Sequence, residues 1–166
     1  KKIIALIPAR SGSKRVKNKN IKSFFGHPLI AYSINLAIIS KLFDRVIVST
    51  DSNKYAKIAK KYGAEVPFLR PKKLSSSKSA DYDWIKFTLD KLKVNKMNYE
   101  YYCLLRPTSP FRSVNMLKKA VNLVTAKPKA DSLRAIELCS QHPYKMWKIN
   151  KDLMKSFINL KINQQP

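Results

Sequence analysis

The sequence predicts an α/β fold, with an open and mostly parallel sheet and helices on both faces. Short apolar runs rich in β-branched residues alternate along the chain with segments whose apolar residues recur at helical spacing. Polar loops that contain Ser follow several of these apolar runs. Strands that alternate with helices in this way are typical of a parallel sheet covered by helices.

The expected strands of the sheet are the apolar runs 2–8, 45–50 and 101–105. Residues 66–69 are expected as a short strand or an extended piece, because Pro67 and Pro71 restrict the backbone there. Residues 131–136 are expected as a further strand, since they form another short run with apolar members.

The expected helices cover residues 28–40, 53–62, 80–93 and 114–125. Asp51 and Ser52 are candidates to cap the second helix, and Gly63 suits its carboxyl end. Beyond Gln141 the apolar residues are mixed with Lys and Asn and follow no clear period. The sequence predicts no regular element there.

A basic loop ends the first expected strand. Residues 7–20 read Ile-Pro-Ala-Arg-Ser-Gly-Ser-Lys-Arg-Val-Lys-Asn-Lys-Asn. Gly12 between Ser11 and Ser13 can let backbone N–H groups converge on phosphate oxygens, and the flanking cations supply charge. The loop therefore predicts a polyphosphate site, with a solvated basic turn as the alternative. It lacks the second Gly of a Walker A loop.

Two further loops are expected beside the basic loop. Residues 49–52 follow the second strand, and residues 105–112 follow the strand 101–105. Because an open α/β sheet binds its ligand at the carboxyl ends of its strands, the three loops are expected at one edge of the sheet.

Five stretches of the chain carry a family resemblance, in the order expected: 7–14 with Lys19-Asn20, 48–51, 67–71, 105–112 and 141–145. With them the chain resembles the sugar nucleotidyltransferases, most closely the cytidylyltransferases that activate acidic nine-carbon sugars. The resemblance implies a Rossmann-like nucleotidyltransferase fold. It also implies a reaction of CTP with a sialic, legionaminic or pseudaminic acid that gives a CMP-sugar and pyrophosphate.

The resemblance also implies a set of site residues. Those implied to bind the triphosphate and to act in catalysis are Arg10, Lys14 and Lys19. Further nucleotide contacts are implied for Ser11, Gly12, Ser13, Asn20, Arg70 and Asp81. The acceptor sugar is expected at Arg106, Thr108, Ser109, Arg112 and His142.

Some of these residues have an alternative interpretation. Arg70 and Arg112 would serve equally as partners of an Asp or Glu in a salt bridge. Asp51 fits a helix cap better than a catalytic role.

Three departures from the family pattern bear on function. Arg106 stands where many relatives carry Gln, and residues 78–81 replace a run of Asp, Thr, Ala and Ser. The family's late Asp-x-Asp pair, which binds Mg²⁺, and its dimerising arm would lie beyond Pro166. We therefore expect residues 1–166 to be a single nucleotidyltransferase domain that is incomplete at the C-terminus. Mg²⁺ and a homodimer are expected of the full-length family, while the metal ligands in this chain stay unknown.

The charge of the chain suggests a competing function. Lys and Arg number 34 against 10 acidic residues, a formal net charge of +24, which favours an anionic partner. The lysines are scattered over the expected helices rather than gathered in a stripe, so nucleic acid is not expected as the main partner. The alternative function is an inactive, truncated relative that acts as a basic nucleotide- or nucleic-acid-binding module.

Composition also bounds the location of the protein. No apolar run approaches the roughly 18 residues that span a bilayer, so no membrane partner is expected. Cys103 and Cys139 lie in apolar surroundings without metal-ligand spacing. We expect them to be buried free thiols in a reducing compartment, which favours the cytoplasm.

Overall fold

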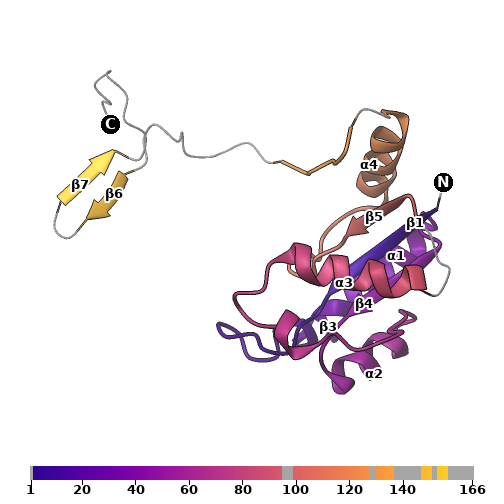
Figure 1. Ribbon diagram of the computed structural model, residues 1–166, viewed down its shortest axis with the longest axis horizontal. Coiled ribbons are helices and arrows are strands. Elements are labelled where there is room, and N and C mark those ends of the chain that lie inside the picture. Colours follow the sequence, from indigo (N-terminus) through magenta and orange to yellow (C-terminus); the bar gives the residue numbers. More distant parts are fainter. Residues whose placement is uncertain (1, 95–98, 128–129, 137–146, 151–152, 157–166) are drawn as a thin grey trace. The chain divides into compact units, whose positions relative to one another are not determined.

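The computed structural model describes residues 2–94, 99–127, 130–136, 147–150 and 153–156 (Figure 1). The chain divides into two compact units, Lys1–Lys129 and Ala130–Pro166. The first unit holds the sheet and its helices, and the second holds a short hairpin. The expectation of a single domain over residues 1–166 stays a prediction.

A parallel sheet of three strands forms the centre of the first unit. β1 (Ile3–Pro8) lies between β4 (Arg45–Ser49) and β5 (Tyr101–Leu104), and both neighbours run parallel to it. Leu6 is opposite Ile47 on one side and opposite Leu104 on the other. The three long strands expected from the sequence are confirmed, and so is the parallel sheet.

Helices follow the strands as the sequence predicts. The first two are α1 (Leu29–Ser40) and α2 (Asn53–Lys61), and the next two are α3 (Asp81–Val94) and α4 (Val114–Ala126). Each begins and ends within one residue of its expected bounds. None of the helices among the described residues is long and apolar enough to span a bilayer.

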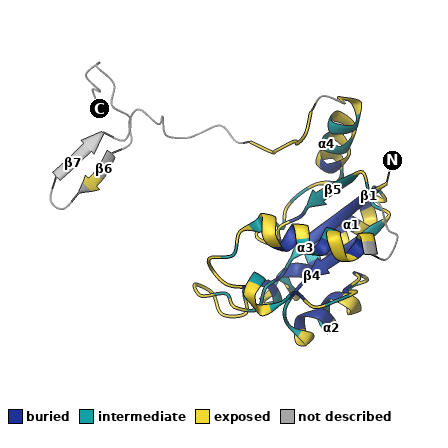
Figure 2. Cartoon of the chain, in the orientation of Figure 1, coloured by how far each residue is buried: buried dark blue, intermediate teal, exposed yellow. Residues whose placement is uncertain are grey.

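Side chains of β1 alternate between two separate apolar cores. Ile4 and Leu6 pack with Trp84 and other residues of α3 on one face. Ala5 and Ile7 pack on the other face, with residues of α1, α2 and α4. Both faces of the strand are buried, as Figure 2 shows for the central strands. The prediction of helices on both faces is confirmed.

The structure shows which residues begin and end α2, including whether Asp51 or Ser52 is its N-terminal cap. The Ser52 hydroxyl accepts a hydrogen bond from the backbone N–H of Tyr55, so Ser52 is the cap and Asp51 is not. Gly63 has a φ of +89°, and its N–H donates to the Lys60 carbonyl. This left-handed residue ends the helix as expected.

Residues 66–69 form an extended piece rather than a named strand. Glu65 bridges to Ile47 of β4, and the Arg70 N–H donates to the Thr50 carbonyl at 2.7 Å. The segment therefore runs beside β4 and brings Arg70 to the end of that strand.

The strand expected at 131–136 is wrong. These residues are described, exposed and not in a strand, and Ile136 is 94% exposed. Apolar composition favours a strand only where a neighbouring strand and a buried face are available. Within the described residues, 131–136 have neither.

Two antiparallel hairpins were not predicted. β2 (Ser23–Phe24) pairs with β3 (His27–Pro28) across Phe25 and Gly26, which both have positive φ. In the second unit, β6 (Trp147–Asn150) pairs with β7 (Leu153–Ser156). Each strand of these hairpins is only two to four residues long, so even the apolar/polar alternation of Trp147–Asn150 was too short to predict a strand.

Candidate active site

A cavity of about 260 Å³ lies at the carboxyl edge of the sheet, between the loops after β1 and β5, with Arg70 reaching it from the segment beside the end of β4. The predicted site residues that line it are Arg10, Ser13, Lys19, Asn20, Arg70, Asp81, Arg106 and Thr108. The expectation that three loops gather at one edge of the sheet is confirmed, because the three strands are parallel and Ser11 of the first loop bonds to Asp51 of the second.

The first part of the basic loop is tied to the end of β4. The Ala9 N–H donates to the Ser49 carbonyl at 2.9 Å. The Asp51 carboxylate accepts from the Ser11 N–H at 2.8 Å and from the Ser11 hydroxyl at 2.7 Å. Because both oxygens of Asp51 hold Ser11, residues 9–11 are fixed against β4 before any ligand binds.

The second part of the loop returns to the cavity through a tight turn. Asn18 has a φ of 54°, and its side-chain carbonyl accepts from the hydroxyl of the buried Tyr55 at 3.3 Å. The amide of the buried Asn20 donates to the Arg10 carbonyl at 3.1 Å. This last bond joins the two arms of the loop, so that Arg10 and Lys19 line one cavity.

Gly12 lies between these two anchors in open space. A Cβ added at Gly12 would meet nothing within 4 Å, and the residue has no left-handed backbone. Its lack of a side chain is therefore not required by the fold. The open space leaves room for a ligand to approach the backbone of the loop.

Arg70 is a buried cation in the wall of the cavity. Its side chain donates to the Ser49 carbonyl at 2.7 Å and to the Ser49 hydroxyl at 3.1 Å. The guanidinium lies 4.6 Å from the centre of the Trp84 ring. Burial lowers the pKa of Arg70 to about 10. No salt bridge of Arg70 occurs among the described residues, so that alternative is wrong.

Asp81 joins the start of α3 to the loop after β5. It accepts from the Trp84 indole N–H at 2.9 Å and pairs with the Arg106 guanidinium. Burial alone would raise the pKa of Asp81, but the hydrogen bonds from Trp84 and Arg106 lower it. The pair holds Arg106 at the rim of the cavity.

Arg112 organises its own loop. It donates to the Arg106 carbonyl at 3.0 Å and to the Ser109 carbonyl at 2.8 Å. Burial lowers the pKa of Arg112, and the described residues give it no salt bridge, so that alternative is wrong as well. Thr108 lines the cavity, whereas Ser109 and Arg112 support the loop from outside it.

Comparison with known proteins identifies the family. Residues 4–155 match the family described as Cytidylyltransferase. This chain belongs to the cytidylyltransferase family.

Three curated relatives are similar to this cytidylyltransferase chain. The N-acylneuraminate cytidylyltransferase of Escherichia coli O18:K1:H7 is 46% identical over 122 residues, which are 74% of this chain and 28% of that protein. A pseudaminic acid cytidylyltransferase of Campylobacter jejuni is 40% identical, covering 72% of this chain and 51% of the relative. The CMP-N,N'-diacetyllegionaminic acid synthase of Legionella pneumophila is 40% identical, covering 76% and 55%. The chain spans about half the length of these relatives, or less.

Solved structures agree with the fold. A CMP:2-keto-3-deoxy-manno-octonic acid synthetase complexed with CTP superposes with a TM-score of 0.65 at 19% identity, covering 78% of this chain and 49% of that one. A cytidylyltransferase from Leptospira borgpetersenii gives a TM-score of 0.59 at 26% identity, covering 77% and 50%. These matches support the open α/β nucleotidyltransferase fold of the cytidylyltransferase chain.

Other predicted site residues lie away from the cavity or outside the description. Ser11, Gly12 and Lys14 belong to the basic loop but do not line the cavity. His142 lies outside the described residues, as do Cys139 and the motif at 141–145. Cys103 is a half-buried free thiol, and burial raises its pKa.

Sequence reasoning missed several residues of the cytidylyltransferase cavity. Trp84 and three serines of the loop before α3, Ser76, Ser77 and Ser79, line it. Trp84 is a buried residue of α3, and its indole bond to Asp81 and its contact with the Arg70 guanidinium show its role in the cavity wall.

The described residues do not fit a magnesium site. Among them, no group of three or more His, Cys, Asp or Glu side chains could hold a metal. Asp51 and Asp81 lie near the cavity, but Ser11 occupies both oxygens of one, and Trp84 and Arg106 occupy those of the other. Mg²⁺ favours free carboxylate oxygens beside substrate phosphates.

Proposed function

We propose that this chain carries the CTP site of an enzyme that joins CTP to an acidic nine-carbon sugar of the sialic, legionaminic or pseudaminic acid type. The observation that carries the proposal is one cavity lined by Arg10, Lys19, Arg70 and Arg106 at the carboxyl edge of a parallel sheet. The names of the relatives support the substrates.

The proposed reaction is a nucleotidyl transfer. A hydroxyl oxygen of the sugar attacks the α-phosphorus of CTP, the bond from that phosphorus to the bridging oxygen breaks, and pyrophosphate leaves with the bonding electrons. The hydroxyl proton is lost to solvent. Negative charge grows on the leaving oxygens, so fixed cations beside them lower the barrier.

The basic loop is proposed to bind the triphosphate. Arg10 and Lys19 reach the cavity from its two arms, and Lys14 lies exposed between them. Arginine can hold phosphate through two parallel hydrogen bonds, and lysine contributes a point charge. Gly12 offers its backbone N–H, whereas the Ser11 N–H is donated to Asp51 and the Ser13 N–H to the Ser11 carbonyl. Asn20 fixes Arg10.

Arg70 and Asp81 are proposed to lie at the cytosine end of the site. Arg70 is held by Ser49 and Trp84, so its guanidinium is oriented before the base arrives. Asp81 keeps Trp84 and Arg106 in place.

The loop after β5 is proposed to receive the acceptor sugar. Arg106 and Thr108 line the cavity there, and a guanidinium suits a sugar that carries a carboxylate. Ser109 and Arg112 shape that loop, while His142 is retained as an acceptor contact from its family motif alone.

Mg²⁺ is the expected cofactor of the complete enzyme. Because the described carboxylates do not fit it, we assign no ligand and no step to the metal. We also propose a cytoplasmic homodimer. A free Cys103 and the need for CTP support the location, and sedimentation of the purified protein tests the dimer.

Nucleotide preference tests the proposed function. Ligands that bind the folded state raise its melting temperature by mass action, so CTP should shift it more than ATP or GTP do. Equal shifts would indicate a nonspecific anion site. A pyrophosphate-release assay with each of the three sugar acids then identifies the acceptor.

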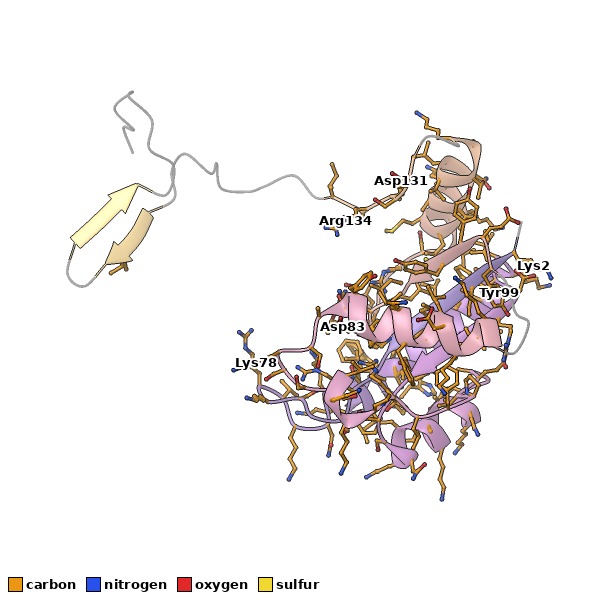
Figure 3. All side chains as sticks on the ribbon, in the orientation of Figure 1. Lys2, Lys78, Asp83, Tyr99, Asp131 and Arg134 are labelled. Carbon is orange, nitrogen blue, oxygen red and sulfur yellow. The ribbon has the colours of Figure 1, made fainter. Side chains whose placement is uncertain are left out.

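The net charge of +24 supports a second candidate, a basic module that binds nucleic acid. Figure 3 shows side chains tipped with nitrogen on several elements of the first unit rather than on a single stripe. A polyelectrolyte binder loses affinity steeply as salt rises. A shallow salt slope for an oligonucleotide, together with CTP preference, would reject this candidate.

A further inference from the structure

Asp51 is an acidic residue in a place where an anion is expected to bind. It follows β4 at the edge of the sheet, next to a loop whose cations face the cavity. A carboxylate near phosphate groups repels them, so its charge alone would weaken nucleotide binding. We therefore expect Asp51 to favour nucleotide binding in another way that offsets this repulsion.

The contacts of Asp51 provide that role. Its Oδ1 accepts from the Ser11 N–H at 2.8 Å, and its Oδ2 accepts from the Ser11 hydroxyl at 2.7 Å. These are two short, charge-assisted bonds to one residue, from a residue forty positions away in sequence. Ser11 directly follows Arg10, so the clamp also fixes the backbone from which the Arg10 side chain extends.

Neighbouring contacts reinforce the same anchor. Tyr55, in the first turn of α2, holds Asn18 at the far arm of the loop, and Asn20 holds the Arg10 carbonyl. Burial raises the pKa of Tyr55, and the charge of Asp51 adds to the shift, so the phenol stays protonated and able to donate. Both arms of the loop are thus fastened to the segment that begins with Asp51.

We infer that Asp51 is a positioning residue, which holds the basic loop in the shape that binds a triphosphate. The inference deepens the proposed function and rests on it. Asp51 acts through Ser11 and touches no substrate itself. Preorganised donors bind a ligand more tightly because less freedom is lost on binding.

Charge and position predict opposite results for one substitution. If Asp51 only repels phosphate, Asp51→Ala should strengthen CTP binding. If Asp51 positions the loop, Asp51→Ala should weaken CTP binding by about tenfold. This is the size of effect expected when a charge-assisted hydrogen bond that holds the binding loop is lost. Titration calorimetry with CTP and with inorganic tripolyphosphate measures both.

The variant Asp51→Asn removes the negative charge of Asp51 but can keep its hydrogen bonds to Ser11. The amide oxygen still accepts from the Ser11 N–H, and the amide nitrogen can donate to the Ser11 hydroxyl. We expect its affinity for CTP to stay within about threefold of the wild type, because the bonds are kept and the repulsion is removed. Equal losses in Asp51→Asn and Asp51→Ala would mean that Asp51 acts through its charge and not through its bonds to Ser11, and would overturn the inference.

Two controls exclude simpler explanations. Asp90→Ala also removes one carboxylate, from an exposed pair with Lys86 on α3, and should leave CTP affinity unchanged. Cytidine, which has no phosphate, should bind wild type and Asp51→Ala equally. A general loss of structure would lower cytidine binding as well, and that outcome would count against a positioning role.

Ser11→Ala keeps the test open if Asp51→Ala does not fold. It removes only the hydroxyl bond, so a loss of about threefold in tripolyphosphate affinity is expected. No loss in a folded Ser11→Ala variant would overturn the inference. If the wild-type protein binds tripolyphosphate but does not bind CTP more tightly than ATP or GTP, the proposed function is wrong. The tripolyphosphate affinities of the wild type and the variants would still test whether Asp51 positions the loop.

Discussion

Arg70 and Arg112 each donate to backbone carbonyl oxygens, and this pattern was invisible in the sequence. A guanidinium that loses water needs other acceptors, and carbonyl groups at the ends of strands and in tight loops supply them. Arg70 donates a hydrogen bond to the Ser49 carbonyl, and Arg112 donates to the carbonyls of Arg106 and Ser109. The motifs placed both residues near the cavity, but only the geometry separates the one that lines it from the one that supports a loop.

Arg10→Ala tests the proposed phosphate site. Loss of a charge-assisted hydrogen bond should weaken CTP binding by about 1.5–3 kcal/mol. Folding should be nearly unchanged, because within the part of the chain that the structure describes the Arg10 side chain makes one long hydrogen bond, of 3.5 Å to the Ser75 carbonyl. Calorimetry and urea unfolding measure the two effects.

Arg15→Ala is the matched control for Arg10→Ala. Arg15 is an exposed cation of the same loop and does not line the cavity. An equal loss of CTP affinity in both variants would show that the loop acts through its total charge, and the specific placement of phosphate at Arg10 would be wrong.

The Asp81–Arg106 pair makes a pH-dependent contribution to stability. The folded state lowers the pKa of Asp81, so the contribution is present above the unfolded value and is lost as pH falls through the folded one. Asp81→Asn should therefore reduce stability at pH 7, by less than about 1 kcal/mol for so exposed a pair. The difference from wild type should shrink below about pH 4.

Asp83→Asn controls for the helix terminus. Asp83 lies in the same first turn of α3 as Asp81 and is labelled in Figure 3. Both substitutions remove a negative charge from the start of the helix, but only Asp81 pairs with Arg106. Urea unfolding at pH 7 and pH 3 should separate them, and identical profiles would assign the effect to the helix dipole instead.

At the scale of elements, the sequence predicted what local pattern determines. Buried apolar runs predicted β1, β4 and β5, because a strand covered on both faces needs no polar alternation. Spacing and caps predicted the four helices of the first unit. The strand expected at 131–136 failed because pairing depends on a neighbour that the local sequence does not contain.

The candidate site was predictable to the same extent. Loops after parallel strands meet at one edge, so the gathering of Arg10, Arg70 and Arg106 followed from topology and motifs. The clamp of Asp51 on Ser11 and the bond of Tyr55 to Asn18 did not, since each joins residues about forty positions apart in sequence. Such contacts depend on how the elements pack.

Gly63 and Gly12 make a matched pair of glycines that tests this packing. Gly63 has a φ of +89°, and an added Cβ would lie 2.9 Å from the Ile38 Cδ1 atom. Gly63→Ala should destabilise the fold by about 1 kcal/mol or more, through left-handed strain and a shift of Ile38. Thermal unfolding measures the change.

Gly12→Ala should leave stability unchanged, because its added Cβ would meet nothing within 4 Å. It should still weaken CTP binding if the triphosphate approaches the backbone of the basic loop as proposed. A Gly12→Ala variant with normal CTP affinity would show that phosphate keeps away from this backbone.

At the scale of the whole molecule, binding and turnover should separate in the 166-residue chain. The cations Arg10, Lys14 and Lys19 already bind the triphosphate before reaction, so only the part of their attraction that grows with the charge on the leaving oxygens raises the turnover rate. The described carboxylates near the cavity are already engaged, so they leave no evident place for Mg²⁺. We expect CTP to raise the melting temperature while pyrophosphate release stays slow, even with saturating Mg²⁺ and each of the three sugar acids. Suppose instead that pyrophosphate release is rapid, and that Asp81→Asn abolishes it without changing the affinity for CTP. That result would show that the Asp81 carboxylate breaks its pair with Arg106 and binds the metal.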